Sequence, residues 1–257
     1  MNPGKRIRMN SIFRKEDGRS VIIAIDHGGI AGPIKGIINP AHVMKSCIEG
    51  GADAILTTRG FVKASIDVWD RRTSLILRLT GGFTVLGGRF EEEFISTPET
   101  ALFFGAGGAP SPMHEIDHSF NYCLVADSCE RWGIPLMIEA MARGKDIKPT
   151  DPDGVKLASR AAQEIGADIV KSYYTGDPDT FREVIEGCPV PVVILGGKKT
   201  ESLKDVFQDV YDSLQAGAAG IAIGRNIWQH GDTQAVVEAM VNLVHGGWSV
   251  KQAFNYI

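Results

Sequence analysis

Residues 167–171 read Ala-Asp-Ile-Val-Lys, and they lie between two amphipathic stretches, Asp153–Ile165 and Asp177–Glu186. The spacing of apolar residues in both flanking stretches predicts helices, and an aspartate stands where it can cap the first of them. A short apolar run between helices is typical of a parallel strand, because both faces of such a strand are buried. The segment therefore predicts one repeat of an α/β fold.

The same alternation extends over most of the chain. Seven further runs are expected to be strands, the fourth of the eight being the poorest match: Ser20–Ile25, Asp53–Thr57, Ser74–Leu79, Ala101–Phe104, Ile134–Ile138, Val190–Leu195 and Ala219–Ile223. Four further stretches have helical spacing: Pro40–Gly50, His114–Trp132, Leu203–Ala216 and Thr233–His245. Eight such units in 257 residues predict a single-domain α/β fold, a (β/α)8 TIM barrel over residues 20–257, with residues 1–19 as an N-terminal arm over its base.

A doubly wound dinucleotide-binding sheet is the alternative architecture. The glycines of Asp26–Gly32 do not follow the GxGxxG spacing, and no acidic residue closes a second strand. The sequence therefore argues against a dinucleotide site.

Composition excludes several classes of function. The net charge is -4 and no long basic run is present, so we expect no nucleic-acid partner. No stretch approaches eighteen uninterrupted apolar residues, and the first residues lack an apolar signal segment, so we expect a cytoplasmic protein without a membrane partner. The cysteines lack ligand spacing and are expected to be small buried side chains: Cys47, Cys123, Cys129 and Cys188. A helix surface explains His114, Asp117 and His118 better than a metal site does.

The active site of a TIM barrel lies at the carboxyl ends of its strands. The polar residues expected there are Asp26, His27, Thr58, Arg59, Arg78, Glu139, Lys171, Lys198 and Arg225. A lysine at such a place is costly to desolvate, and burial favours the neutral amine that attacks a carbonyl carbon. A lysine that reaches back to solvent is the plain alternative for Lys171.

Alternation of side chains along a strand links two of these residues. Ile169 shares a face with Lys171, and Ala24 shares a face with Asp26. If both faces point inward, the amine and the carboxylate meet in the barrel mouth. Asp26 is then a candidate acid/base group, whereas His27 is equally well explained as a substrate ligand or a hydrogen-bonded loop residue.

The loops after the seventh and eighth strands form the usual phosphate site of this fold. Here they carry Gly196 and Gly197, and then Gly224 and Arg225. Glycines let the backbone approach an anion and an arginine adds charge, although tight turns alone could also explain the glycines. We therefore predict a phosphorylated small-molecule substrate.

With these residues placed, the chain resembles the class I aldolases of the deoxyribose-phosphate and archaeal-type fructose-bisphosphate aldolase group. The matching motifs are Ile25-Asp26-His27-Gly28, Thr58-Arg59-Gly60, Ala142-Arg143-Gly144, Ile169–Tyr174, Pro189–Lys199 and Gly224-Arg225-Asn226-Ile227. Locally, Lys171-Ser172-Tyr173-Tyr174, Gly187–Pro191 and Gly196–Lys199 resemble the thiolase that processes phosphorylated autoinducer-2. Aminodideoxyheptulosonate synthases belong to the same group.

The resemblance implies a Schiff base on Lys171, a substrate-contacting acid at Asp26 and phosphate binding at the four residues of the two late loops. It also implies a homo-oligomeric ring, for which a decamer is one candidate size. One departure is that Met141 stands where the fructose-bisphosphate members carry a catalytic tyrosine. Glu139, Tyr173 and Tyr174 are the candidates to replace that tyrosine.

The sequence thus predicts a class I Schiff-base aldolase acting on a phosphorylated ketose, with Lys171, Asp26 and Glu139 as catalytic residues. No metal and no organic cofactor are expected, because the iminium supplies the electron sink. Two alternatives remain open at this point. One is acyl transfer on a phosphorylated diketone, and the other is a non-catalytic barrel that binds sugar phosphates.

Overall fold

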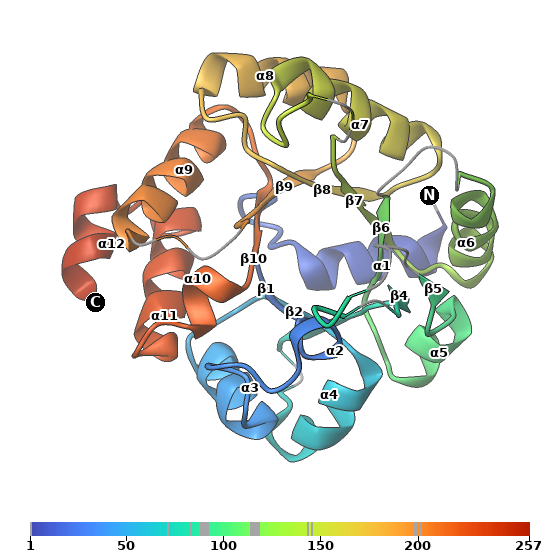
Figure 1. Cartoon of the computed structure of the whole chain (residues 1–257), viewed down its shortest axis with the longest axis horizontal. Helices are drawn as coiled ribbons and strands as arrows, with labels where there is room; N and C mark the ends of the chain where they lie inside the picture. The colour runs from blue at the N-terminus through green and yellow to red at the C-terminus, as the bar shows by residue number, and fades with distance from the viewer. Residues whose placement is uncertain are drawn as a thin grey trace.

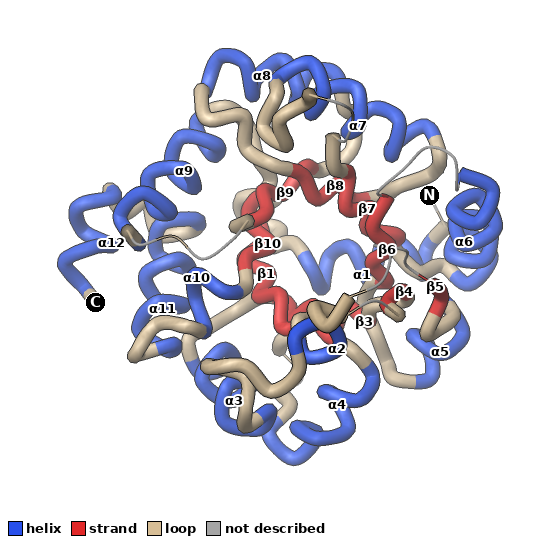
Figure 2. Tube along the Cα trace, in the orientation of Figure 1, coloured by secondary structure: helices blue, strands red, loops and turns tan. Residues whose placement is uncertain are grey.

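The computed structural model describes residues 2–70, 72–82, 84–87, 93–113, 119–142, 144, 146–197, 200 and 202–257. Its core is a ring of parallel strands surrounded by helices (Figures 1 and 2). The ring consists of β1 (Ser20–Ile25), β2 (Ala54–Thr57), β3 (Ser74–Leu77), β6 (Ala109–Met113), β7 (Leu136–Ala140), β8 (Ile169–Ser172), β9 (Val192–Leu195) and β10 (Gly220–Ile223). The strands pair in the order β3-β2-β1-β10-β9-β8-β7-β6, and the TIM barrel prediction is confirmed.

The helices surround the barrel, except that the first of them, which precedes β1, lies across its base (Figure 2). They are α1 (Pro3–Ile12), α2 (Gly28–Ala31), α3 (Pro40–Glu49), α4 (Arg59–Ser65) with the 3-10 turn Ile66–Val68, α5 (Pro98–Phe103), α6 (Ser119–Trp132), α7 (Pro152–Glu164), α8 (Pro178–Gly187), α9 (Leu203–Gln215), α10 (Arg225–Trp228), α11 (Thr233–Val244) and α12 (Val250–Tyr256). Local sequence explains where several begin. Asp151 and Asp177 cap α7 and α8, and a proline follows each cap at the first helical position.

The sequence prediction for the fourth strand was wrong. The run Ala101–Phe104 lies at the end of α5, and the strand of the barrel is β6, five residues further along. Thr97 begins the helix by accepting a hydrogen bond from the Thr100 amide, and Pro98 occupies its first turn. These capping signals precede an apolar run that is too short to distinguish a helix from a strand by its pattern alone.

Prolines in β6 explain why this strand was missed and why the barrel closes weakly there. Leu77 and Leu79 of the β3 segment donate hydrogen bonds to the carbonyls of Gly108 and Pro110, at 3.0 and 3.1 Å. Pro110 therefore faces β3, and Pro112, two positions on, has its nitrogen on the same side. Neither proline can donate a hydrogen bond in return. The β6 side therefore donates to β3 only from Gly107 and Gly108, just before the strand, to the Leu75 carbonyl, and at Pro110 it can only accept. In contrast, β6 pairs with β7 along its whole length.

The interior of the barrel is a separate cluster of apolar side chains. It contains Ile22, Ala24, Ala54, Leu56, Ile76, Met137, Ile169, Val193 and Ala222 from the strands, with Ile12 and Phe13 from the end of α1 and the residue after it. Helix α1 runs across the base of the barrel and is visible through its opening in Figure 2. The outward residues of the strands pack in a second cluster against the surrounding helices. The interior is therefore filled at its base, and only the opposite end is left for a site.

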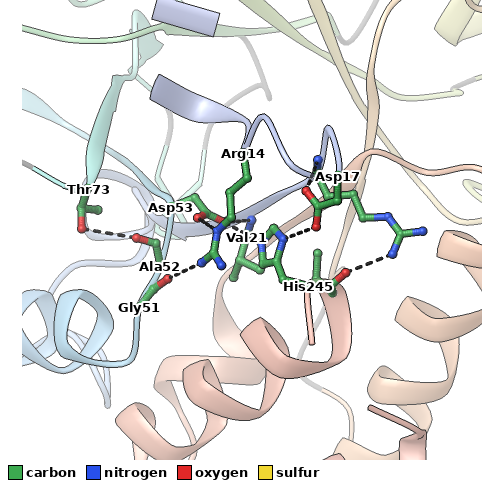
Figure 3. Close-up of polar contacts among 10 residues, drawn as sticks. Arg14, Asp17, Val21, Gly51, Ala52, Asp53, Thr73 and His245 are labelled. Atoms are coloured by element: carbon green, nitrogen blue, oxygen red, sulfur yellow. Dashed lines mark hydrogen bonds and ion pairs between the residues drawn. The ribbon is translucent and has the colours of Figure 1, made fainter. Parts of the chain in front are cut away.

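A polar network fixes the segment after α1 beneath the barrel (Figure 3). The two ring nitrogens of His245 lie 2.6 Å from Asp17 Oδ2 and 2.9 Å from Asp53 Oδ2. Asp53 also accepts hydrogen bonds from Arg14 Nε at 2.6 Å and from the Val21 amide at 2.7 Å. The network joins the start of β1, the start of β2 and the end of α11, so it orders the base and takes no part in the mouth.

Candidate active site

The mouth of the barrel receives one inward side chain from each of four strands. Asp26, Arg78, Glu139 and Lys171 each lie two positions beyond an interior apolar residue of the same strand segment. Because side chains alternate along a strand, all four continue the inward faces of β1, β3, β7 and β8. The structure therefore brings together residues that lie up to 145 positions apart, from position 26 to position 171.

Lys171 and Glu139 form a pair across neighbouring strands. They are register partners in the β7–β8 ladder, and Lys171 Nζ lies 3.1 Å from Glu139 Oε1. Lys171 is only 6% exposed, so its amine does not reach back to bulk solvent. A buried amine beside a group that can exchange a proton is equipped for nucleophilic attack on a carbonyl.

Asp26 lies at the centre of a second cluster. Arg78 donates from Nη1 to Asp26 Oδ2 and from Nε to the Thr80 carbonyl, the latter at 3.0 Å. His27 Nδ1 lies 3.2 Å from Asp26 Oδ1. Burial alone raises the pKa of Asp26, yet this pKa lies well below the usual aspartate range, because the charge of Arg78 lowers it strongly. His27 and the charge of Lys171 lower it further, so Asp26 is a carboxylate.

His27 stands at the rim of the mouth. Its ring meets the Trp228 indole edge-on, with centroids 5.4 Å apart. Trp228 in turn donates a hydrogen bond from Nε1 to the Ala24 carbonyl at 2.9 Å. This contact fixes α10 against the end of β1 and positions His27 between Asp26 and the loop after β10.

The two glycine loops are tied together beside the mouth. Arg225 donates from Nη2 to the Gly197 carbonyl at 2.9 Å, and Asn226 donates from Nδ2 to the Gly196 carbonyl at 2.7 Å. Asn226 also accepts a hydrogen bond from the Thr200 amide at 2.8 Å. The sequence analysis quoted Asn226 within a motif but gave it no role. Its burial, which the sequence does not show, is what requires these hydrogen bonds.

Close packing explains two of these glycines without any ligand. A Cβ at Gly224 would lie 2.4 Å from the Ala24 carbonyl oxygen, and a Cβ at Gly196 would lie 2.6 Å from Ile223 Cγ2. The Nε atom of Arg225 is buried and has no hydrogen-bond partner among the described residues, so this loop still presents an unsatisfied donor.

Lys198 and Lys199 lie outside the described residues, as do Arg71 and Arg143.

The three candidates to replace the family's catalytic tyrosine, Glu139, Tyr173 and Tyr174, have different surroundings in the structure. Glu139 contacts Lys171 directly, whereas Tyr174 packs edge-on against Phe181 in the cluster outside the barrel, with centroids 5.2 Å apart. Burial raises the pKa of Tyr174, which makes it a poorer proton donor. The ring of Tyr173 lies near Gly197. Among the three, Glu139 is the one with a direct contact to the amine, at 3.1 Å.

No group of three His, Cys, Asp or Glu side chains in the described part of the chain is placed to hold a metal ion. The cluster of His114, Asp117 and His118 lies outside that part. Three cysteines are buried as predicted, but Cys123 is exposed. Within the described residues, none of the helices is long and apolar enough to span a membrane.

Comparisons with known proteins relate the chain to aldolases. A model of the DeoC/LacD family aldolases matches residues 20–106 and 121–230. An uncharacterized aldolase of Saccharolobus solfataricus is 31% identical over 99% of both chains. The class 1 fructose-bisphosphate aldolase of Thermoproteus tenax is 32% identical over 93% of this chain and 94% of the relative.

Solved structures point to the same group. A Schiff-base-forming fructose-1,6-bisphosphate aldolase superposes with a TM-score of 0.85 at 31% identity, over 94% of this chain and all of the other. The resemblance predicted from the motifs is confirmed. A family match over most of the barrel and relatives above 30% identity lead to one conclusion: the chain belongs to the DeoC/LacD family of aldolases.

Proposed function

We propose that the protein is a class I aldolase that cleaves or forms a carbon–carbon bond in a phosphorylated ketose through an iminium on Lys171. The observation that carries the proposal is the buried amine of Lys171, 3.1 Å from Glu139 Oε1 at the open end of the barrel. Membership of an aldolase family and similarity to a Schiff-base-forming aldolase support it.

The reaction requires the following bond changes. The neutral amine of Lys171 adds to the substrate ketone, and the carbinolamine loses water to give the iminium. A base then takes the proton from the hydroxyl on the β carbon, and the bond between the α and β carbons breaks. Its electron pair moves to the iminium nitrogen, which leaves an enamine and an aldehyde. Protonation of the enamine and hydrolysis return the free lysine.

Asp26 and Glu139 are the carboxyl groups that we assign to this chemistry. Glu139 contacts the amine and can exchange protons as the carbinolamine forms and loses water. Asp26 is a carboxylate on the same inward face and stabilises the positive charge of the iminium. His27 lies beside Asp26 at the rim, where it can contact a substrate hydroxyl.

The phosphate group is assigned to the loops after β9 and β10. Gly196, Gly197, Gly224 and Arg225 lie in the place where TIM barrels commonly bind phosphate. The buried, unsatisfied Nε of Arg225 supports this assignment, because an anion would complete its hydrogen bonding. Binding energy from the phosphate would hold the ketone carbon against Lys171.

Trapping of the iminium tests the proposal. Sodium borohydride is added to the protein with fructose 1,6-bisphosphate or dihydroxyacetone phosphate, and the adduct is located by peptide mass spectrometry. We expect one reduced adduct, on Lys171, with both compounds. An adduct that forms without cleavage of the bisphosphate would redirect the search to phosphorylated diketones and acyl transfer. No adduct with any phosphorylated ketone or diketone would leave only the non-catalytic barrel.

Cytoplasmic location and assembly into a homo-oligomeric ring also belong to the proposal. The assembly is checked by the native mass from light scattering coupled to size-exclusion chromatography. A monomer at micromolar concentration would contradict it.

A further inference from the structure

The sequence singled out Arg78 at the end of the third strand but gave it no role. In the structure Arg78 is 8% exposed and lies against Asp26, which is 4% exposed. Its guanidinium donates to the carboxylate and, through Nε, to the Thr80 carbonyl at 3.0 Å. Thr80 begins β4 (Thr80–Gly81), which pairs with β5 (Glu93–Phe94) in a short ribbon after β3. Arg78 therefore joins the site carboxylate to the backbone of the loop beside it.

The planar fork of the guanidinium fixes both the charge and the direction of a carboxylate. One donor is bound to Asp26 and another to a backbone carbonyl, so the side chain of Arg78 is held in one place. Asp26 accepts a hydrogen bond from Arg78 on Oδ2, and its Oδ1 lies 3.2 Å from His27 Nδ1. An aspartate bound to an anchored guanidinium has less freedom to swing between a substrate and a second proton acceptor.

We propose that Arg78 is a positioning residue that holds Asp26 as a permanent, oriented carboxylate, so that Asp26 stabilises the iminium charge on Lys171 and Glu139 carries the protons. This inference rests on the proposed function for its catalytic part. It assigns different roles to the carboxyl groups of Asp26 and Glu139, because their surroundings differ. One is paired with an arginine, and the other is paired with the reacting amine.

The charged and titratable groups around Asp26 determine how its pKa should change when Arg78 is replaced. Burial raises the pKa of Asp26, whereas Arg78 just after β3, His27 just before α2 and Lys171 on β8 all lower it. The charge of Arg78 is the largest single cause that lowers it. Removing Arg78 leaves a buried carboxylate with weaker compensation, so the pKa of Asp26 must rise.

The experiment compares Arg78→Met and Arg78→Lys with wild type. The carboxyl carbon of Asp26 is followed by ¹³C NMR from pH 3 to pH 9, with Asp26→Asn used to assign its signal. In wild type we expect no Asp26 midpoint in this range, because its pKa lies well below the usual aspartate range. In Arg78→Met a midpoint should appear in the range, and in Arg78→Lys the rise should be smaller. With fructose 1,6-bisphosphate as substrate, kcat/KM should fall about 10- to 100-fold near neutral pH in Arg78→Met. A new loss of activity toward low pH should appear with it, and Asp26→Asn should lack that acid limb.

A matched control lies just before the same strand. Arg72, just before β3 and at the base, pairs with Asp70 at 2.7 Å, but its side chain is 88% exposed. Arg72→Met should leave the Asp26 midpoint unchanged and kcat/KM within about twofold of wild type.

The outcomes separate this inference from the proposed function. An unchanged Asp26 midpoint in Arg78→Met overturns the inference, whether or not the protein cleaves sugar phosphates. A raised midpoint with activity reduced by the same factor at every pH overturns the catalytic part, since a purely structural role gives that result. If Arg78→Met does not fold, Arg78→Lys carries both measurements. If wild type forms no borohydride adduct, the proposed function fails, and the NMR titration alone decides whether Arg78 sets the charge of Asp26.

Discussion

Two lysines are buried near opposite ends of β8. Lys5 on α1 is 3% exposed and contacts Asp168, just before the strand, at 2.9 Å. Lys171 near the end of the strand is 6% exposed and contacts Glu139 at 3.1 Å. Burial is therefore almost the same at the two sites, and it cannot by itself identify a catalytic lysine.

The difference lies in the partners and in access. Lys5 forms ion pairs with both Glu130 and Asp168, at the base that Ile12 and Phe13 fill. Burial lowers the pKa of Lys5, but its two carboxylates raise it by more, so Lys5 stays an ammonium ion. Lys171 pairs with one carboxylate among the described residues and faces the open end. A lysine held by two carboxylates at a filled base is structural, whereas one held by a single carboxylate at the mouth can react.

The largest effect should come from Lys171→Met. The substitution keeps most of the side-chain volume but removes the nucleophile, so we expect kcat to fall at least about 10⁴-fold and the borohydride adduct to disappear. Turnover of fructose 1,6-bisphosphate in a coupled assay and intact-protein mass measure the two effects. An active Lys171→Met protein would refute the Schiff-base mechanism and would remove the distinction between the two lysines.

Glu139→Gln should have the next largest effect. The amide keeps the size of the side chain and can still accept a hydrogen bond from Lys171, but it cannot transfer a proton. We expect kcat to fall about 10²- to 10⁴-fold while slow adduct formation persists. Single-turnover kinetics separate adduct formation from cleavage. Normal turnover would show that another residue carries the protons.

The sequence predicted that Lys171 and Asp26 meet at the mouth, because two simple rules are sufficient for that prediction. Alternation along a strand places Lys171 on the face of Ile169 and Asp26 on the face of Ala24, and the barrel rule places both strand ends together. The structure adds that these faces point inward. The catalytic roles of these residues remain proposals that the substitutions above test.

The pairings that define each site could not be read from the sequence. Arg78 and Asp26 are 52 residues apart, and Lys5 and Glu130 are 125 apart. No local pattern encodes such contacts, because they depend on which strands and helices become neighbours. The prediction of the fourth strand was wrong for a different reason. Pro110 and Pro112 argue against a strand with two neighbours, and the true β6 tolerates them because its donors toward β3 are dispensable.

Lys5→Met tests the structural half of the comparison and should have the smallest effect. It leaves Asp168 and Glu130 without their cation, but Glu130 is 58% exposed and remains solvated. Burial raises the pKa of Asp168 in spite of Lys5, so the pair is weaker than a fully compensated one. We therefore expect a loss of about 1–3 kcal/mol in the free energy of unfolding at pH 7, measured by urea denaturation, with the Lys171 adduct unchanged.

The raised pKa of Lys5 determines how the stability lost in Lys5→Met should depend on pH. Because the pKa of Lys5 in the folded protein is raised above its unfolded value of 10.5, the stabilisation is complete below pH 10.5 and is lost as pH rises through the folded value. The stability difference between wild type and Lys5→Met should therefore be constant from pH 6 to pH 9 and shrink above pH 11. Lys45→Met, which removes an exposed i,i+4 pair with Glu49 at 3.7 Å, should change stability by less than about 0.5 kcal/mol. If Lys5→Met is as stable as this control, the ion pairs of Lys5 do not stabilise the fold. The contrast between a structural lysine before β8 and a reactive lysine near its end would then be wrong.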